Sequence, residues 1–224
     1  MVFPSLYRLL PLIFLISCSG YKNTFQTSSS LSAVSQGQAL PVIDTTFINL
    51  KDYSTDFVYD MRYATKNNFL KAQVYDCAEC FLRFKTAQAL IKANNDFKKL
   101  GYSIKIYDCY RPLDIQRKMW KIVSNPKYVA DPAKGSIHNR GGAVDITLVD
   151  KNGNELAMGT DFDFFGPEAA HKFKGHQKEI RQNRKLLKKV MLKNGFAAFE
   201  SEWWHYNLLG SAKDPVSNSK WKCN

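Results

Sequence analysis

Three side chains suited to metal binding occur in two short stretches of the chain. The stretch SIHNRGGAVD contains His138 and, seven positions later, Asp145. The stretch ESEWWHY contains Glu202 and His205 on either side of two tryptophans. A catalytic zinc requires three protein ligands, an open position for water and a carboxylate that moves protons. His138, Asp145 and His205 match the ligand role, and Glu202 matches the proton-transfer role.

Each stretch also has a purely structural explanation. The first could be a glycine turn between two strands with a hydrogen-bonded surface histidine. The second could be a cross-strand aromatic cluster. On a flat strand, positions 202 and 205 point to opposite faces, so a bulge or turn must intervene if both serve one metal. The remaining histidines, His171 and His176, lie on a strongly basic segment and are interpreted as surface residues.

Hydrophobic periodicity predicts the elements that position these residues. Alternating and aromatic patterns predict strands over 57–65, 102–112 and 142–150, and a strand pair or hairpin over 195–209. Helical spacing predicts helices over 83–101 and 113–123, and an amphipathic basic helix within 171–195 that stops at Gly195. Because strands and helices are interspersed without regular β-α-β alternation, the pattern indicates an α+β fold.

Five motifs in order resemble one enzyme family. S-x-H-x-x-G-x-A-x-D at 136–145 together with E-W-W-H at 202–205 is similar to the D-alanyl-D-alanine dipeptidases, the VanX-type zinc peptidases. DMRYATKNNF, YDCYRP and MGTDFDFF match further family segments, and the resemblance spans residues 42–210. It implies a small zinc-peptidase domain with a central, mostly antiparallel sheet flanked by helices.

The resemblance also implies a reaction. A zinc metallopeptidase of this type cuts D-Ala-D-Ala into two D-alanines in cell-wall precursor or peptidoglycan metabolism, with one Zn²⁺ per chain on His138, Asp145 and His205. Glu202 would take a proton from the attacking water and pass it to the leaving amine. Arg111 would stabilise the oxyanion, a contribution of about 3 kcal/mol.

Two further residues are assigned to the substrate by the same resemblance. Asp163 matches the position that receives the free ammonium group of the dipeptide, and Ser136 matches a substrate contact towards the carboxylate end. Asp161 lies two positions from Asp163, and the residues alone do not choose between them. The resemblance selects Asp163.

Two rival functions remain open from the sequence. The first is a related zinc D,D-carboxypeptidase or endopeptidase that acts on peptidoglycan stem peptides. The MG-x-x-FD loop favours the dipeptidase because it supplies an acid for a free amino terminus. The second rival is a non-catalytic envelope-binding lipoprotein. The presence of Glu202 argues against a simple binder, which has no need of a base.

The N-terminus predicts export. Residues 1–17 have the length and flanks of a signal peptide, with an apolar run too short for a helix that spans a bilayer, which takes about 20 residues. LISC resembles a bacterial lipobox, which makes Cys18 the lipidated residue; the alternative is an ordinary cleaved signal with an incidental cysteine. Residues 18–41 form a predicted flexible tether. We therefore expect a periplasmic protein anchored by lipid, in the outer membrane if the organism has one.

Four cysteines remain after Cys18. In an oxidising compartment Cys77, Cys80, Cys109 and Cys223 favour structural disulfides, with three pairings possible. The C-x-x-C pair could instead suggest a zinc knuckle or a redox pair, but a four-cysteine zinc site needs a second closely spaced pair. Residues 211–224 form a predicted C-terminal tail that is loose unless Cys223 fixes it.

The net charge of +12 is concentrated in the predicted basic helix. Residues 171–195 contain nine Lys or Arg residues and a single acid, Glu179. An apolar stripe at helical spacing accompanies them, so the charges form a solvated face. No nucleic-acid signature accompanies this charge, and the anionic neighbours expected for an exported protein are envelope polymers and lipid head groups.

Overall fold

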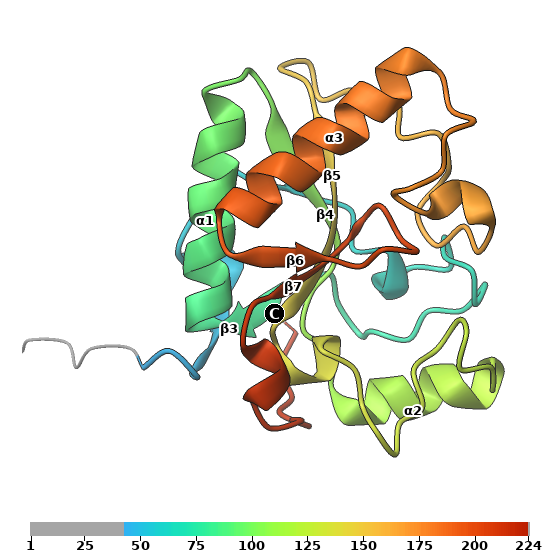
Figure 1. Cartoon of the computed structure of the whole chain (residues 1–224). Helices are drawn as coiled ribbons and strands as arrows, with labels where there is room; N and C mark the ends of the chain where they lie inside the picture. Colours follow the sequence, from blue (N-terminus) through green and yellow to red (C-terminus); the bar gives the residue numbers. More distant parts are fainter. Residues whose placement is uncertain (1–42, 224) are drawn as a thin grey trace, which may run out of the picture. The chain divides into compact units, whose positions relative to one another are not determined.

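The computed structural model describes residues 43–223 of the chain (Figure 1). The predicted signal peptide at 1–17, the predicted lipidation site Cys18 and the predicted tether at 18–41 lie outside the described residues. Within residues 43–223, no helix has both the length and the apolar character that crossing a bilayer requires.

A five-stranded sheet forms the centre of the domain, in the order β2-β4-β5-β7-β6. Its strands are β2 (Val58–Tyr59), β4 (Ser103–Asp108), β5 (Ala143–Val149), β7 (His205–Leu208) and β6 (Phe196–Ala198). β2 pairs with β4 in parallel, and every other pair in this sheet is antiparallel. β1 (Phe47–Asn49) and β3 (Phe81–Arg83) pair antiparallel in a second, two-stranded sheet. The prediction of a mostly antiparallel central sheet is confirmed.

Within residues 43–223, three α-helices accompany the sheets, and together they confirm the α+β class. α1 (Phe84–Lys98) and α2 (Leu113–Ile122) fall inside the helices predicted from periodicity, and α3 (Lys178–Lys193) is the basic helix. α1 and α3 contact each other, and α1 packs against β4 and α3 against β6, whereas α2 lies away from both helices (Figure 1). Gly195 follows α3 with φ +85°, a left-handed conformation that glycine adopts without steric penalty.

β5 is the central strand and is buried along its whole length. Val144, Ile146 and Leu148 point into the hydrophobic core, as the alternating pattern predicts. The opposite face carries Asp145 and Thr147, which are also buried, at 3% and 0% exposure. A carboxylate buried on a central strand requires partners, because an isolated charge away from water is costly.

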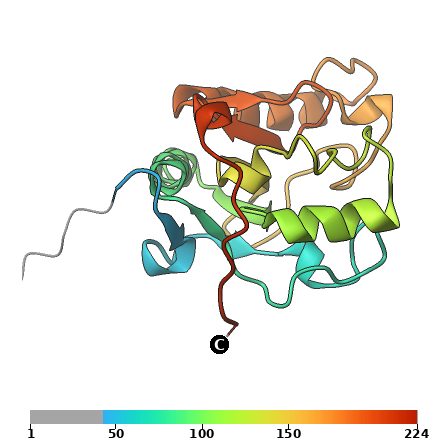
Figure 2. The ribbon, with the colours of Figure 1, turned by 90° about the horizontal axis from the view of Figure 1, so that it is seen from below.

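The segment after residue 210, set apart as a tail in the sequence, packs against the rest of the domain. Ser217 N donates to the Asn139 carbonyl at 2.8 Å, and the Trp221 ring stacks on Phe81 with centroids 4.7 Å apart. Seen from below, this segment runs across the domain beside the start of α2 (Figure 2). Aromatic packing and a disulfide therefore hold the segment in place.

Two disulfides select one of the three possible pairings. Cys77 is bonded to Cys223, and Cys80 to Cys109. Both members of the C-x-x-C pair are thus disulfide-bonded, which leaves them unavailable for a zinc knuckle. The Cys80–Cys109 bond joins the residue before β3 to the residue after β4, and so constrains the backbone next to the candidate metal ligands.

Candidate metal centre

His138 is presented by a single turn of 3-10 helix, η3 (His138–Arg140), directly before β5. Gly141 ends this turn with φ +67°, and a Cβ on Gly142 would lie 2.2 Å from the Cβ of Ser211. One glycine thus provides the turn and the other a close approach. His138 is only 3% exposed, which excludes the explanation of this stretch as a surface histidine.

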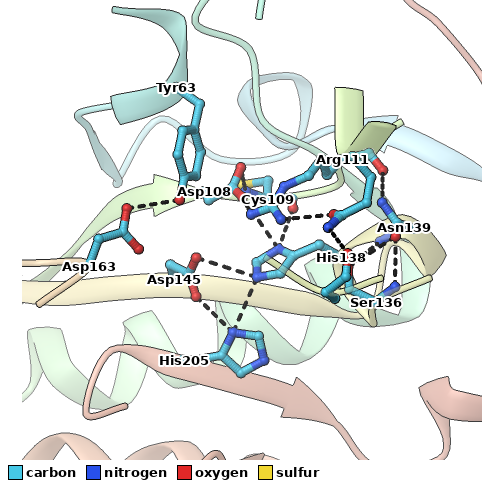
Figure 3. Close-up of polar contacts among 12 residues, drawn as sticks. Tyr63, Asp108, Cys109, Arg111, Ser136, His138, Asn139, Asp145, Asp163 and His205 are labelled. Atoms are coloured by element: carbon cyan, nitrogen blue, oxygen red, sulfur yellow. Dashed lines mark hydrogen bonds and ion pairs between the residues drawn. The ribbon is translucent and has the colours of Figure 1, made fainter. Parts of the chain in front are cut away.

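The three expected ligands meet in one place. His138, Asp145 and His205 offer ligand atoms that all lie within 4.8 Å of one another. His138 Nε2 is 3.2 Å from His205 Nδ1 and 3.4 Å from Asp145 Oδ2, and Asp145 Oδ1 is 2.9 Å from His205 Nδ1 (Figure 3). Ligand atoms around a tetrahedral zinc are separated by about 3.3–3.6 Å. The residues therefore fit zinc with small adjustments.

The other nitrogen of each imidazole has its own hydrogen-bond acceptor. His138 Nδ1 donates to the Cys109 carbonyl at 2.7 Å, and His205 Nε2 donates to Asn207 Oδ1 at 2.9 Å. These bonds set the tautomers that leave His138 Nε2 and His205 Nδ1 as free electron pairs for a metal. Sequence reasoning missed Asn207, although its i+2 position relative to His205 places it on the same strand face.

Electrostatics within the cluster favour a bound cation. Burial acts to raise the pKa of Asp145, but His138 and His205 outweigh it and hold this pKa below its usual range. Burial acts to lower the pKa of His205, but the Asp145 carboxylate outweighs it and raises the pKa to about 8. The carboxylate is thus ionised and available as a ligand, and a bound cation would displace the proton that this carboxylate favours on His205. This donor set of two nitrogens and one oxygen is typical of catalytic zinc.

The cluster opens onto a cavity of about 260 Å³. Its walls include the three candidate ligands and all the other residues expected at the site, namely Arg111, Ser136, Asp163 and Glu202, together with Tyr63. A larger cavity, of about 670 Å³, is lined largely by residues 155–164 and contains none of the three candidate ligands. The site is therefore identified by the residues that line it and not by the volume of the cavity. Three ligands beside a cavity are what a catalytic zinc needs, because its fourth position would be left to water or substrate.

Glu202 lies in the turn between β6 and β7, not on a strand. Its backbone N–H donates to the Phe199 carbonyl at 3.1 Å, which folds the chain back before β7 begins at His205. This turn brings the 202 and 205 side chains to one cavity, as the sequence argument required. Burial raises the pKa of Glu202, and Asp145 raises it further. Trp203 and Trp204, 2% and 1% exposed, pack behind the turn.

Arg111 follows β4 and is held rigidly. Its Nη2 donates to Asp108 Oδ2 at 2.6 Å and its Nη1 donates to Gln116 Oε1 at 3.0 Å, while its guanidinium carbon lies 5.2 Å from the centre of the Tyr63 ring (Figure 3). Burial acts to lower the pKa of Arg111, but Asp108 outweighs it and raises this pKa. Asp108 is fully buried, so this ion pair lies away from solvent.

Asp163 stands on a strained backbone and accepts one hydrogen bond. Its φ is +61°, in the left-handed region where such residues concentrate at functional sites. The Tyr63 hydroxyl donates to Asp163 Oδ2 at 2.8 Å. Burial raises the pKa of Asp163 well above its usual range, and Asp145 adds to this. Asp161, the sequence alternative, is exposed and lines the cavity behind residues 155–164 instead.

Tyr63 is a second residue that sequence reasoning missed. It belongs to the RYAT segment, whose resemblance to the family predicts no role for the tyrosine. Ser136, in contrast, is where the motif places it: its hydroxyl donates to Asn139 Oδ1 at 3.1 Å, and Asn139 Nδ2 donates to the Arg111 carbonyl at 2.8 Å. Ser136 and Arg111 are therefore linked through Asn139.

Comparison with known proteins agrees with this geometry. The D-alanyl-D-alanine dipeptidase of Escherichia coli is 34% identical over 181 residues, which cover 80% of this chain and 94% of that protein. The D-alanyl-D-alanine dipeptidase of Enterococcus faecalis is 31% identical over 172 residues, 67% of this chain and 85% of that protein.

Solved structures show a partial likeness. The LdcB LD-carboxypeptidase overlays with a TM-score of 0.41 at 23% identity, covering 59% of this chain and 62% of that one. A zinc-bound mutant of the vancomycin-resistance D,D-pentapeptidase VanY overlays with a TM-score of 0.39 at 15% identity, covering 59% and 75%. A family description, D-Ala-D-Ala dipeptidase, matches residues 44–222, and with the two relatives it confirms the sequence prediction. The chain belongs to the D-Ala-D-Ala dipeptidase family.

Proposed function

We propose that this protein is a zinc-dependent dipeptidase that hydrolyses D-Ala-D-Ala to two D-alanines in peptidoglycan metabolism. One observation carries the proposal: a three-residue ligand cluster, Glu202 and Asp163 all line a single cavity of about 260 Å³. The size and the two additional acids suit a short substrate with a free amino terminus.

The metal site divides its chemistry between the ion and the chain. Zinc held by His138, Asp145 and His205 supplies acidification of water and polarisation of a carbonyl. Glu202 accepts the proton of the attacking water on a carboxylate oxygen and delivers it to the leaving amine. A pKa above that of an ordinary glutamate suits both transfers, because the same group must take and release the proton near neutral pH.

Arg111 provides positive charge for the negative oxygen that develops on the scissile carbonyl. Asp108 and Gln116 hold the guanidinium in place before the reaction, so no reorganisation is needed when charge develops. Such a preorganised group contributes about 3 kcal/mol to the transition state.

The ends of the substrate are distinguished by Asp163 and Ser136. A buried carboxylate whose pKa is raised gains most from a cationic partner, and the ammonium group of a free dipeptide is such a partner. Tyr63 orients Asp163 through its hydroxyl. Ser136, in the motif at 136–145, is assigned to the carboxylate end of the dipeptide.

Peptidase activity on longer stem peptides is the alternative, and its substrate differs from the dipeptide at the amino end. A stem peptide carries an acyl group where the dipeptide carries an ammonium, so it leaves the Asp163 carboxylate without a cation. A non-catalytic envelope-binding role has no use for the basic carboxylate of Glu202, which receives no side-chain hydrogen bond within residues 43–223.

The test is incubation of the zinc-loaded full chain with four substrates: D-Ala-D-Ala, its N-acetyl form, L-Ala-L-Ala and a stem pentapeptide. We expect release of D-alanine from D-Ala-D-Ala alone. Efficient cleavage of the N-acetyl dipeptide or the pentapeptide would replace the dipeptidase with the stem-peptide enzyme, and no cleavage of any substrate would favour the binder.

We propose further that the protein is exported and held in the cell envelope by a lipid on Cys18. The signal-like residues 1–17 and the lipobox support this, as do two disulfides, which persist in oxidising compartments. Metabolic labelling with a radioactive fatty acid should mark the wild-type chain and not Cys18→Ser. Equal labelling of both chains, or recovery of both from the cytosol, would contradict the anchor.

A further inference from the structure

A second cavity, of about 430 Å³, is lined by residues of α3, by the segment that precedes it and by Glu200. α3 and the segment before it lie in the upper right part of Figure 1. None of the second cavity's lining residues lines the active-site cavity. Its walls carry one carboxylate, Glu200, and six cationic side chains: Lys172, Lys174, Arg181, Arg184, Lys185 and Lys188.

The carboxylate does not neutralise these cations. Glu200 Oε1 pairs with Lys188 Nζ at 2.7 Å, which occupies one of the six. Arg181 Nη1 donates to two backbone carbonyls, those of Lys174 and His176. The cavity therefore retains a large excess of positive charge, concentrated by its concave walls.

Arg184 is the residue that most favours an anion in this cavity. Its side chain is buried, at 5% exposure, and its Nε and Nη1 donate to the carbonyls of Met158 and Glu168 at 2.6 and 2.8 Å. Its Nη2 is buried without a hydrogen-bond partner, and no carboxylate among residues 43–223 forms an ion pair with it. A buried guanidinium without a counter-ion is costly, and an anion in the cavity would relieve that cost.

His171 also lines this cavity and is affected by the same cations. Its Nε2 is also buried without a partner. Burial lowers the pKa of His171 to about 4, and Lys188 and Arg184 contribute to the shift. The neighbouring cations thus add to the effect of burial, while Glu200 acts in the opposite direction.

We propose that this cavity binds a phosphate group carried on a small organic molecule or a lipid head group. A phosphate brings several acceptor oxygens for the exposed lysines and a negative charge that would offset the charge of Arg184. The cavity volume falls within the range of about 300–1,000 Å³ for small-molecule sites, so there is room for a substituent on the phosphate. The site is separate from the zinc cluster, and the inference does not depend on the proposed dipeptidase activity.

The test measures binding of inorganic phosphate and glycerol 3-phosphate to the zinc-loaded full chain, with chloride keeping the ionic strength constant. Calorimetry gives the affinity, and the imidazole resonances of His171 locate the site, because phosphate could also reach zinc. We expect saturable binding with a change in the His171 resonances and a rise in the His171 pKa. Saturation without any change at His171 would overturn the proposal.

A matched pair of double variants separates a site from general charge attraction. Lys172→Glu with Lys185→Glu removes two exposed cations of the cavity, and Lys151→Glu with Lys189→Glu makes the same charge change outside it. The first pair should weaken phosphate binding about tenfold or more, since one charged hydrogen bond is worth about that factor. Equal weakening by both pairs would overturn the proposal. Circular dichroism checks that each variant is folded.

Vesicles distinguish the two sources of phosphate. All chains in this arm carry Cys18→Ser, and the vesicles contain phosphatidylglycerol in phosphatidylcholine. If the ligand is a head group, the cavity pair should lose vesicle binding about tenfold more than the control pair. If the ligand is a soluble phosphate, both pairs should bind vesicles alike while glycerol 3-phosphate still discriminates between them. Failure of the two pairs to differ in either assay would exclude a phosphate site here.

Discussion

Asp145 and His205 are directly opposed residues on the neighbouring strands β5 and β7, and Asp145 Oδ1 lies 2.9 Å from His205 Nδ1. The antiparallel ladder therefore sets the distance between two candidate ligands that are 60 positions apart in the sequence. The third, His138, enters from the turn that leads into the same β5 strand. Ligand geometry is thus a property of the sheet centre, where the backbone is most constrained.

Removing one ligand should remove the metal. His205→Ala should lose most of the bound zinc, because two remaining ligands hold the ion poorly and a metal site of this kind depends on every donor. Zinc content per chain, measured by mass spectrometry of the purified protein, gives the result. His176→Ala is the matched control and should keep a full complement. Full zinc in His205→Ala would refute the ligand assignment.

The partner of His205 should matter almost as much as the ligand. Asn207→Ala removes the acceptor that orients the imidazole, and loss of such a partner weakens metal affinity by about 10–100-fold. Competition with a chelating dye measures the zinc affinity. Asn152→Ala, in an exposed turn, should leave it unchanged. Identical affinities in the two variants would show that Asn207 does not position the ligand.

Substitution of Glu202 and of the nearby Glu200 should show which of the two glutamates is the base. Glu202→Gln keeps the size of the side chain but cannot accept a proton, so turnover of D-Ala-D-Ala should fall at least about 10²-fold while zinc remains. Glu200 is 69% exposed, pairs with Lys188 and does not line the active-site cavity, so Glu200→Gln should be mild. The reverse ranking in steady-state kinetics would show that the base is Glu200 and not Glu202.

Asp163 should control the choice between dipeptide and acylated substrates. Asp163→Ala should cost about 3–5 kcal/mol of transition-state stabilisation for D-Ala-D-Ala, as when a buried charge loses its partner, and leave zinc content intact. kcat/KM for the dipeptide and for its N-acetyl form is the measurement. Asp161→Ala, on the exposed neighbour, serves as the control. A selective loss in Asp161→Ala would move the ammonium site to that residue.

His171 should make stability depend on pH in a defined window. Its pKa is lowered from the usual 6.5 to about 4 on folding, chiefly by burial. Between pH 6.5 and 4 the unfolded chain binds a proton at His171 that the folded chain does not bind. The contribution of His171 to the free energy of unfolding is therefore fully present above pH 6.5 and declines as the pH falls towards 4. Urea denaturation of wild type and His171→Gln in chloride buffers isolates the effect. Parallel pH profiles for the two proteins would contradict it.

Much of this protein could be predicted from local sequence. Helical and alternating spacing located α1, α2, α3, β4 and β5 because periodicity over a few residues records which face an element buries. The types and spacing of His138, Asp145, Glu202 and His205 indicated zinc chemistry because few donor sets suit that ion. The family prediction rested on such short motifs.

Tertiary structure decided what depends on strand order and on chain reversal. The Tyr63–Asp163 hydrogen bond joins residues 100 positions apart, and no local pattern records it. The disulfide pairing and the packing of residues 211–223 depend on which distant segments meet. Glu202 reaches the cavity only because a turn replaces the strand that alternation would continue. Side-chain spacing along a chain encodes local periodicity, whereas the meeting of distant residues is set by sheet register and by the packing of the whole core.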